Sequence, residues 1–411
     1  MNILYSLSYL SLILFILLYP IFPSFGQYST LLLLIGLIFF QLINLIFSKD
    51  ARKNFINSLK NLKNDFLMLS LLFFNLTMYI SILASQNKVS TLGHCIKFSM
   101  YLIILYILSY NIKNKKQLSI LLNTVVITNL IIGLISVYQI ILFFKNGTLV
   151  NEANRITSTL ENPNNLGAYI ILSIFIVFSL ILSSKGILSK LFYSFVFVLQ
   201  LINIISCQSR NALLALVLGA FLITILYNKR YVIFAIILPI VLLLIPQSRV
   251  RLFEIFNMEQ NVSRIKLWKL TGIIIKEHPI QGIGYNNFEY VYGNYVAKNT
   301  DLIIWDGYHP YHPHNIILKV QSELGILGTI AFITFILATI YVFFKLIKSS
   351  INKNNKIIII GLFTSVLAFQ SMNLIDCYYN SPKPLITLLI TLGFINCYNN
   401  LSLEKTLSFK N

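Results

Sequence analysis

Long apolar runs constrain this chain more than any other feature of its sequence. A helix of about 20 apolar residues crosses the hydrocarbon core of a bilayer. Lipid offers no partner to an unpaired backbone group, and the runs lack the alternation of a barrel strand, so each run must be a helix. The runs fall at about 3–21, 29–47, 66–84, 95–111, 118–144, 166–184, 191–206, 211–228, 231–246, 325–346, 357–375 and 384–398. The sequence therefore predicts an all-α polytopic membrane protein, a single membrane domain over residues 1–411 with about twelve transmembrane helices.

Composition excludes the other broad classes. Hydrophobic residues make up 57% of the chain and charged residues 11%, whereas soluble domains carry roughly 25% charged residues. A soluble globule, a disordered chain and a coiled coil are excluded. The four cysteines are scattered without a C-x-x-C spacing, so neither a zinc site nor a disulfide framework is indicated. The first run lacks a preceding basic segment and a small-residue cleavage site, which favours a retained span over a signal peptide.

The charge balance predicts how the helices are oriented. The chain has 32 Lys and Arg against 13 Asp and Glu, a formal charge of +19. On a soluble protein this excess would suggest a nucleic-acid partner. Here, one set of short connections holds eighteen basic residues and the alternate set holds six. By the positive-inside rule, both termini are cytoplasmic, residues 247–324 face outward, and no nucleic acid is expected as a partner.

The one long connection, residues 247–324, is expected to be an extracytoplasmic loop that carries catalytic motifs. It holds four of the five histidines, both tryptophans and seven of the thirteen acidic residues. Connections of this length are usually functional when they are ordered.

Part of this loop, residues 262–278, is predicted to be an amphipathic helix on the membrane surface. Ile265, Trp268, Gly272 and Ile275 would form its apolar face. Arg264 lies off that face, so it either serves surface attachment alone or reaches inward to an anion.

Three polar clusters lie at the outward ends of predicted spans. A helix start presents unpaired N–H groups and a partial positive charge, and an arginine beside it can bind two phosphate oxygens at once. The pattern therefore indicates a phosphate site, although Arg210 could instead anchor to lipid headgroups and Arg155 could be an ordinary loop charge. The clusters are Arg155 with Asn162-Pro163-Asn164, then Ser209-Arg210-Asn211, then His312-Pro313-His314-Asn315 followed by Glu323.

His314 is the candidate general base. Pro313 suits the first position of a helix, which would make His312 the cap and place His314 in the first turn. A helix start disfavours imidazolium, so His314 would stay neutral, as a base must. The alternative roles are an interfacial histidine bonded to a carbonyl, or a metal ligand with His309, His312 and Asp306. The two prolines and the lack of an i, i+4 pair disfavour that metal site, so no metal and no cofactor are expected.

The order and topological side of these motifs resemble the bacterial O-antigen ligase/polymerase family. The resemblance is strongest over about 250–330, where the chain reads Arg264…Trp268…His278-Pro-Ile-Gln-Gly282…His312-Pro-His314-Asn315…Glu323-Leu-Gly325. It implies a GT-C-like membrane enzyme that takes a polyprenyl-diphosphate-linked glycan as donor on the outer face, without metal or nucleotide. It further implies diphosphate-binding, catalytic and supporting residues. These are Arg210, Arg264 and Arg155 for the diphosphate, His314 for catalysis, and His312, Asn315, Glu323, Asn162 and Asn164 in support.

The expected function is a glycosyltransferase that polymerises lipid-linked oligosaccharide repeat units of an O-antigen, capsule or exopolysaccharide. The nearest alternative is an O-antigen ligase that moves finished glycan onto lipid A-core. A lipid-linked oligosaccharide flippase is less favoured, because carriers usually keep charged residues inside their spans and these spans contain almost none. The expected partners are the glycan donor, the glycan acceptor, membrane lipids and polysaccharide-export proteins.

Overall fold

The computed structural model describes residues 1–411 except 1–2, 23–27, 306, 350–351 and 409–411. The described residues form sixteen α-helices and five short 3-10 segments, with no strand among them. The helices are α1 Ile3–Leu18, α2 Tyr28–Phe47, α3 Lys49–Leu62, α4 Phe66–Ile80, α5 Lys88–Tyr110, α6 Lys115–Lys145, α7 Pro163–Ser183, α8 Ile187–Ser206, α9 Arg210–Leu226, α10 Val232–Leu244, α11 Pro246–Phe253, α12 Met258–Glu277, α13 Phe288–Lys298, α14 Ile316–Lys348, α15 Lys353–Met372 and α16 Pro382–Ser408.

All twelve predicted apolar runs are helical. Among the described residues, nine helices are long and apolar enough to cross a membrane, and a bent pair, α10 with α11, adds a tenth crossing if it counts as one. The two remaining runs form α1 and α9, which are apolar but shorter, with 16 and 17 residues. The long run at 118–144 lies in α6, whose 31 residues extend for about 46 Å at 1.5 Å per residue. The chain is a polytopic membrane protein.

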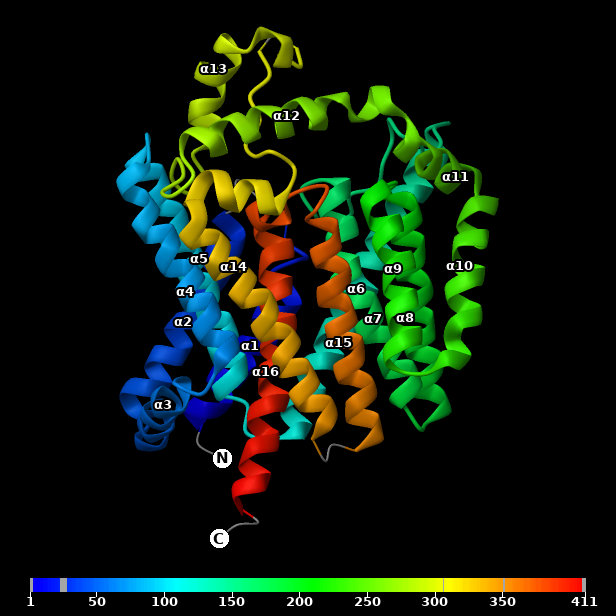
Figure 1. The fold of residues 1–411 in the computed structure, drawn as a ribbon. Coiled ribbons are helices and arrows are strands. Elements are labelled where there is room, and N and C mark those ends of the chain that lie inside the picture. The colour runs from blue at the N-terminus through cyan, green and yellow to red at the C-terminus, as the bar shows by residue number, and fades with distance from the viewer. Residues whose placement is uncertain (1–2, 23–27, 306, 350–351, 409–411) are drawn as a thin grey trace.

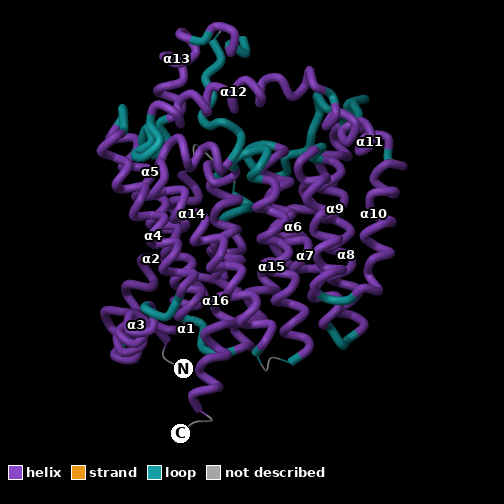
Figure 2. Tube along the Cα trace, in the orientation of Figure 1, coloured by secondary structure: helices purple, strands orange, loops and turns teal. Residues whose placement is uncertain are grey.

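The two ends of the helix bundle differ (Figure 1). At one end of the upright helices, α12 lies across the bundle and α13 lies beyond it. At the other end, α1 begins and α16 ends. Figure 2 shows that most of the loops gather at the end covered by α12. The predicted long connection therefore lies opposite both termini. We call the end covered by α12 the outer end, following the charge bias of the connections.

The helix α14 begins earlier than predicted and is kinked. The predicted span at 325–346 extends back to Ile316, and Gly325 interrupts the helix with φ 64° and ψ −160°. Only glycine adopts such angles without strain, and an added Cβ would meet the carbonyl oxygen of Ile280 at 2.0 Å. The segment before the kink lies across the outer end, and the rest of α14 descends through the bundle (Figure 1).

The centre of the bundle is formed by α7, which packs against α8, α9, α15 and α16. Gly361 in α15 lets that helix approach α7 closely, since an added Cβ would lie 2.5 Å from the carbonyl oxygen of Phe175. Near the outer end, the buried Lys383 donates to the carbonyl oxygens of Thr159 at 2.6 Å and Phe22 at 2.9 Å. Close packing and the hydrogen bonds of Lys383 thus hold the loop that carries the first polar cluster.

The predicted surface helix is present as α12, but its buried face differs from the prediction. The fully buried apolar residues of α12 are Leu267, Leu270 and Ile274, which belong to a small outer core with Phe288 and Tyr292 of α13. The expected apolar face, formed by Ile265, Trp268, Gly272 and Ile275, is only partly buried. The reason is that α13 folds back over the side of α12 that carries the larger aliphatic residues.

Candidate functional site

The three predicted arginines line one cavity at the outer end of the bundle. Arg155 precedes α7, Arg210 begins α9, and Arg264 lies on α12. They line a cavity of about 140 Å³, which Asn164, Asn211 and Asp376 also line. We call it the arginine cavity. Several arginine forks around one small volume form a site for a polyanion such as a diphosphate.

Arg155 both lines the arginine cavity and fixes its wall. Its Nε donates to the carbonyl oxygen of Cys207 at 2.8 Å, and its Nη2 donates to Oδ1 of Asn164 at 2.6 Å. Asn162 caps α7, with its side chain accepting from the N–H of Asn165 at 2.9 Å. Burial lowers the pKa of Arg155, yet an arginine stays charged because its ordinary pKa lies above about 12.

Arg210 and Arg264 approach the arginine cavity from two different elements. Ser209 caps α9, and Nη1 of Arg210 donates to the carbonyl oxygen of Glu254 at 3.1 Å. Arg264 makes no hydrogen bond or ion pair to the described residues, although it lines the same cavity. Its fork is therefore available to a ligand.

Arg251 is a fourth arginine of the cavity and was not predicted. It is buried, and its Nη1 contacts Glu152 at 2.8 Å and Glu254 at 2.5 Å. Its Nε donates to the carbonyl oxygen of Gln208 at 3.0 Å. Because two carboxylates already compensate its charge, Arg251 positions the loop before α9 in addition to facing the cavity. The i, i+3 spacing of Arg251 and Glu254 was the available sequence signal.

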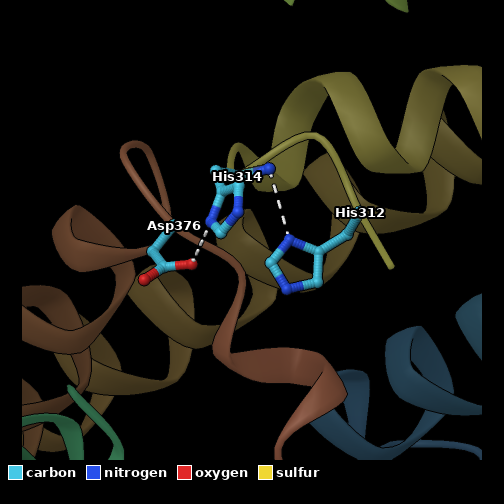
Figure 3. A group of neighbouring side chains, drawn as sticks. All are labelled: His312, His314 and Asp376. Carbon is cyan, nitrogen blue, oxygen red and sulfur yellow. Dashed lines mark hydrogen bonds and ion pairs between the residues drawn. The ribbon is translucent and has the colours of Figure 1, made fainter. Parts of the chain in front are cut away.

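His314 is paired with Asp376, a residue that the sequence analysis did not include in the site. Nδ1 of His314 lies 2.8 Å from Oδ1 of Asp376, which also accepts from the N–H of Cys377 at 2.9 Å (Figure 3). Burial opposes ionisation of Asp376, but the hydrogen bond and charge of His314 hold the pKa of this carboxyl at about 2. In a neutral imidazole, an ionised Asp376 favours the tautomer of His314 with its proton on Nδ1, in which Nε2 is the acceptor. That Nε2 makes no hydrogen bond to the described residues.

The predicted helix cap near His314 is wrong. Asn315, not His312, caps α14, and its Oδ1 accepts from the N–H groups of Ile317 and Leu318. His314 has φ 52° and so lies in a left-handed turn before the helix rather than in its first turn. A short amide side chain caps better than an imidazole, which moves the helix start three residues beyond Pro313.

His312 supports the backbone of His314. Its Nδ1 accepts from the N–H of His314 at 3.2 Å, and the two rings lie edge to face with centroids 4.6 Å apart. Burial, with His314 nearby, lowers the pKa of His312 to about 3. His312 therefore stays neutral, with its proton on Nε2.

Two further contacts hold this turn in place. Nε1 of Trp268 on α12 donates to the carbonyl oxygen of Pro313 at 3.0 Å. Nδ2 of Asn315 donates to the carbonyl oxygen of Leu374 at 2.9 Å, in the same connection as Asp376. The turn is thus fixed from above by α12 and from the side by the α15–α16 connection.

Glu323 does not line the arginine cavity. Its carboxylate is fully buried and bonds Nζ of Lys319 at 2.6 and 2.7 Å. It also accepts from the N–H of Asn286 at 2.7 Å. This ion pair at i, i+4 fastens the turn after α12 onto the start of α14.

A metal would fit poorly at the histidine cluster. Ligand atoms of His312, His314 and Asp376 lie within 4.8 Å of one another. However, Nδ1 of His312 already accepts from a backbone N–H, and Nδ1 of His314 already bonds Asp376. An ion bound at the two Nδ1 atoms would have to displace both of these hydrogen bonds. Of the residues expected in the alternative metal site, His309 is exposed outside this cluster, and Asp306 lies outside the described residues.

Comparison with known proteins gives one family and several relatives. Residues 195–333 match the O-antigen ligase family, a range that includes Arg210, Arg264 and His314. A protein of Rickettsia conorii named as a candidate polysaccharide ligase is 32% identical over 124 residues, which cover 29% of this chain and 28% of that protein. A protein of Rickettsia felis with the same kind of name is 33% identical over 95 residues, 22% of this chain and 21% of its own. The matched segment thus spans less than a third of these relatives.

Proposed function

Because residues 195–333 match the O-antigen ligase family, we propose that the chain is a membrane glycosyltransferase that polymerises polyprenyl-diphosphate-linked repeat units. The products would be an O-antigen, capsule or exopolysaccharide, made on the outer face of a bacterial cytoplasmic membrane with both termini in the cytoplasm. One observation carries the proposal: the cavity lined by Arg155, Arg210 and Arg264 adjoins the His314–Asp376 pair.

In this proposal, the arginine cavity holds the diphosphate of the donor. Charge develops on the diphosphate as its bond to the sugar breaks, and preorganised cations stabilise that charge. Diphosphate is already a good leaving group, so the paired carboxylates of a glycosidase are not needed.

The base would be Nε2 of His314, and Asp376 would position it. The acceptor hydroxyl oxygen attacks the anomeric carbon while its proton passes to Nε2. The bond between that carbon and the diphosphate oxygen breaks, and the electron pair leaves with the diphosphate. Attack opposite the leaving group inverts the anomeric centre, so a product with the donor's configuration would contradict this step.

A ligase is the second candidate, because the relatives named above carry that description. A ligase would use the same donor chemistry and differ only in its acceptor, lipid A-core. Deleting the gene and separating the surface glycan on a gel tests both. Single repeat units without a ladder support polymerisation, whereas full-length polymer left on its lipid supports ligation. An unchanged ladder would contradict both functions.

Asp376→Asn should lower the turnover of lipid-linked repeat units by about 10²-fold or more, since a positioned base contributes about 10²–10⁴-fold. The amide can present an N–H toward His314 and so favour the tautomer with its proton on Nε2. Asp376→Glu should restore part of the activity, because a carboxylate can again accept from Nδ1. Full turnover by the Asn variant would show that Asp376 does not position the base.

A further inference from the structure

A second cavity lies on the other side of the two histidines from the arginine cavity. Its volume is about 420 Å³, within the roughly 300–1,000 Å³ of typical ligand sites. It is lined by one face of α5, by the turn that leads into α13, and by the α15–α16 connection. The residues from α5 that line it recur at helical spacing, at positions 90, 94, 97, 98 and 101. We call it the tyrosine cavity.

The histidines separate the two cavities. His312 lines the tyrosine cavity, and Asp376 lines the arginine cavity. Figure 3 shows the ring of His314 between these two residues, bonded to Asp376 and edge to face with His312. A group transfer needs two substrates with the base between them, and this arrangement supplies one cavity on each side of the base.

The tyrosine cavity has the lining that a sugar requires. Tyr290 and Tyr311 lie at its edge with 41% and 65% of their surface exposed, so a ring face is open to a ligand. Such aromatic groups pack against the C–H face of a sugar and keep a polar tip in water. The carboxylate of Glu289 makes no hydrogen bond to the described residues, and Oδ1 of Asn380 is buried without a hydrogen-bond partner. These acceptors suit sugar hydroxyl groups.

The polar wall of this cavity is rigid rather than adaptable. Nδ2 of Asn286 lies 3.1 Å from Nε2 of His94, and Oδ1 of Asn286 accepts from Asn380 at 3.0 Å. The N–H of Asn286 bonds Glu323, which is paired with Lys319. A fixed wall of this kind favours one orientation of a ligand over many.

We propose that the tyrosine cavity binds the acceptor glycan and presents its hydroxyl group to His314. The proposal rests on the function proposed above and adds the site of the second substrate. The donor's diphosphate is met by arginines on one side, and the hydroxyl-rich glycan of the acceptor is met by tyrosine, carboxylate and amide groups, with Lys97 among them, on the other. His312, which is neutral, lines the second cavity on the side of His314, and Lys97 lines it from α5.

The test uses two variants in a strain that lacks the chromosomal gene, together with purified full-length protein in lipid nanodiscs. In cells, Glu289→Gln and Tyr311→Ala should each lower surface glycan about tenfold or more and raise the pool of lipid-linked glycan. Both purified variants should bind undecaprenyl diphosphate with a Kd within about twofold of the unchanged protein. Glu277→Gln is the matched control, because this exposed carboxylate lies on the same outer segment and lines neither cavity.

Normal surface glycan from both cavity variants would overturn the acceptor site. A tenfold loss of undecaprenyl diphosphate affinity would also overturn it, because the cavity would then belong to the donor. If the proposed glycosyltransferase function itself were wrong, the results would differ from these. The unchanged protein would bind no undecaprenyl diphosphate, and deleting the gene would leave the surface glycan intact.

Discussion

His314→Ala is expected to abolish glycan product while the protein stays in the membrane in its normal amount. Removing a general base costs about 10²–10⁴-fold in rate, which takes the polymer below detection on a gel. The fold should tolerate the change, because 30% of the His314 side chain is exposed and its partner Asp376 retains the N–H of Cys377. Product is measured on a surface-glycan gel, and protein is measured by immunoblot of the membrane fraction.

His309→Ala is the control for this experiment. His309 lies in the same outer segment, is exposed, and does not belong to the cluster of His312, His314 and Asp376, so its loss should leave the ladder unchanged. A normal ladder from His314→Ala would show that another group takes the proton. Loss of the protein from the membrane would instead mean that the histidine turn is needed for folding, and His314→Gln would then be the variant to assay.

The parts of the site that the sequence predicted are those that depend on local pattern and topology. Arg155, Arg210 and His314 each precede or begin a helix at the outer end, and helix starts on one side of a bundle lie close together. That the three clusters share one end of the bundle follows from the number of apolar spans between them, and the basic residues of the short connections predict that this end faces outward. The convergence of the arginines is therefore a consequence of hydropathy and charge, which are both visible in the sequence.

The parts that were missed depend on contacts between distant segments. Asp376 lies 62 residues from His314 along the chain, and they meet because the start of α14 contacts the connection between α15 and α16. Its one available signal was an acidic side chain at the outer end of a span in a chain poor in acids. Pro313 and Asn315 both fit a helix start. The sequence therefore predicts a helix that begins at Pro313, whereas in the structure Asn315 caps α14, which begins at Ile316. The pair of Lys319 and Glu323 could be predicted from its i, i+4 spacing, but its contact with Asn286 could not, because Asn286 lies 37 residues from Glu323.

Arg264→Lys should weaken the binding of undecaprenyl diphosphate by about tenfold to hundredfold, because one hydrogen bond to a charged group is worth about 1.5–3 kcal/mol. A lysine keeps the positive charge but offers a point donor in place of the planar fork. Arg210→Lys should weaken binding at least as much, because it also loses the hydrogen bond to the carbonyl oxygen of Glu254. Affinity is measured with purified protein in nanodiscs. Arg249→Lys is the control, since Arg249 is exposed on α11 and does not line the arginine cavity.

A variant that combines Arg210→Lys with Arg264→Lys tests whether the two arginines bind the same diphosphate. If they do, the losses in binding free energy should not add, because two groups that contact one ligand are coupled by about 0.5–3 kcal/mol. Strict additivity would place them on separate parts of the donor, and full affinity in both single variants would contradict a bidentate diphosphate site. We expect the two losses in binding free energy to be coupled. Arg210 lies on α9 and Arg264 lies on α12, and both line one cavity of about 140 Å³. A single ligand in that cavity would therefore contact both arginines.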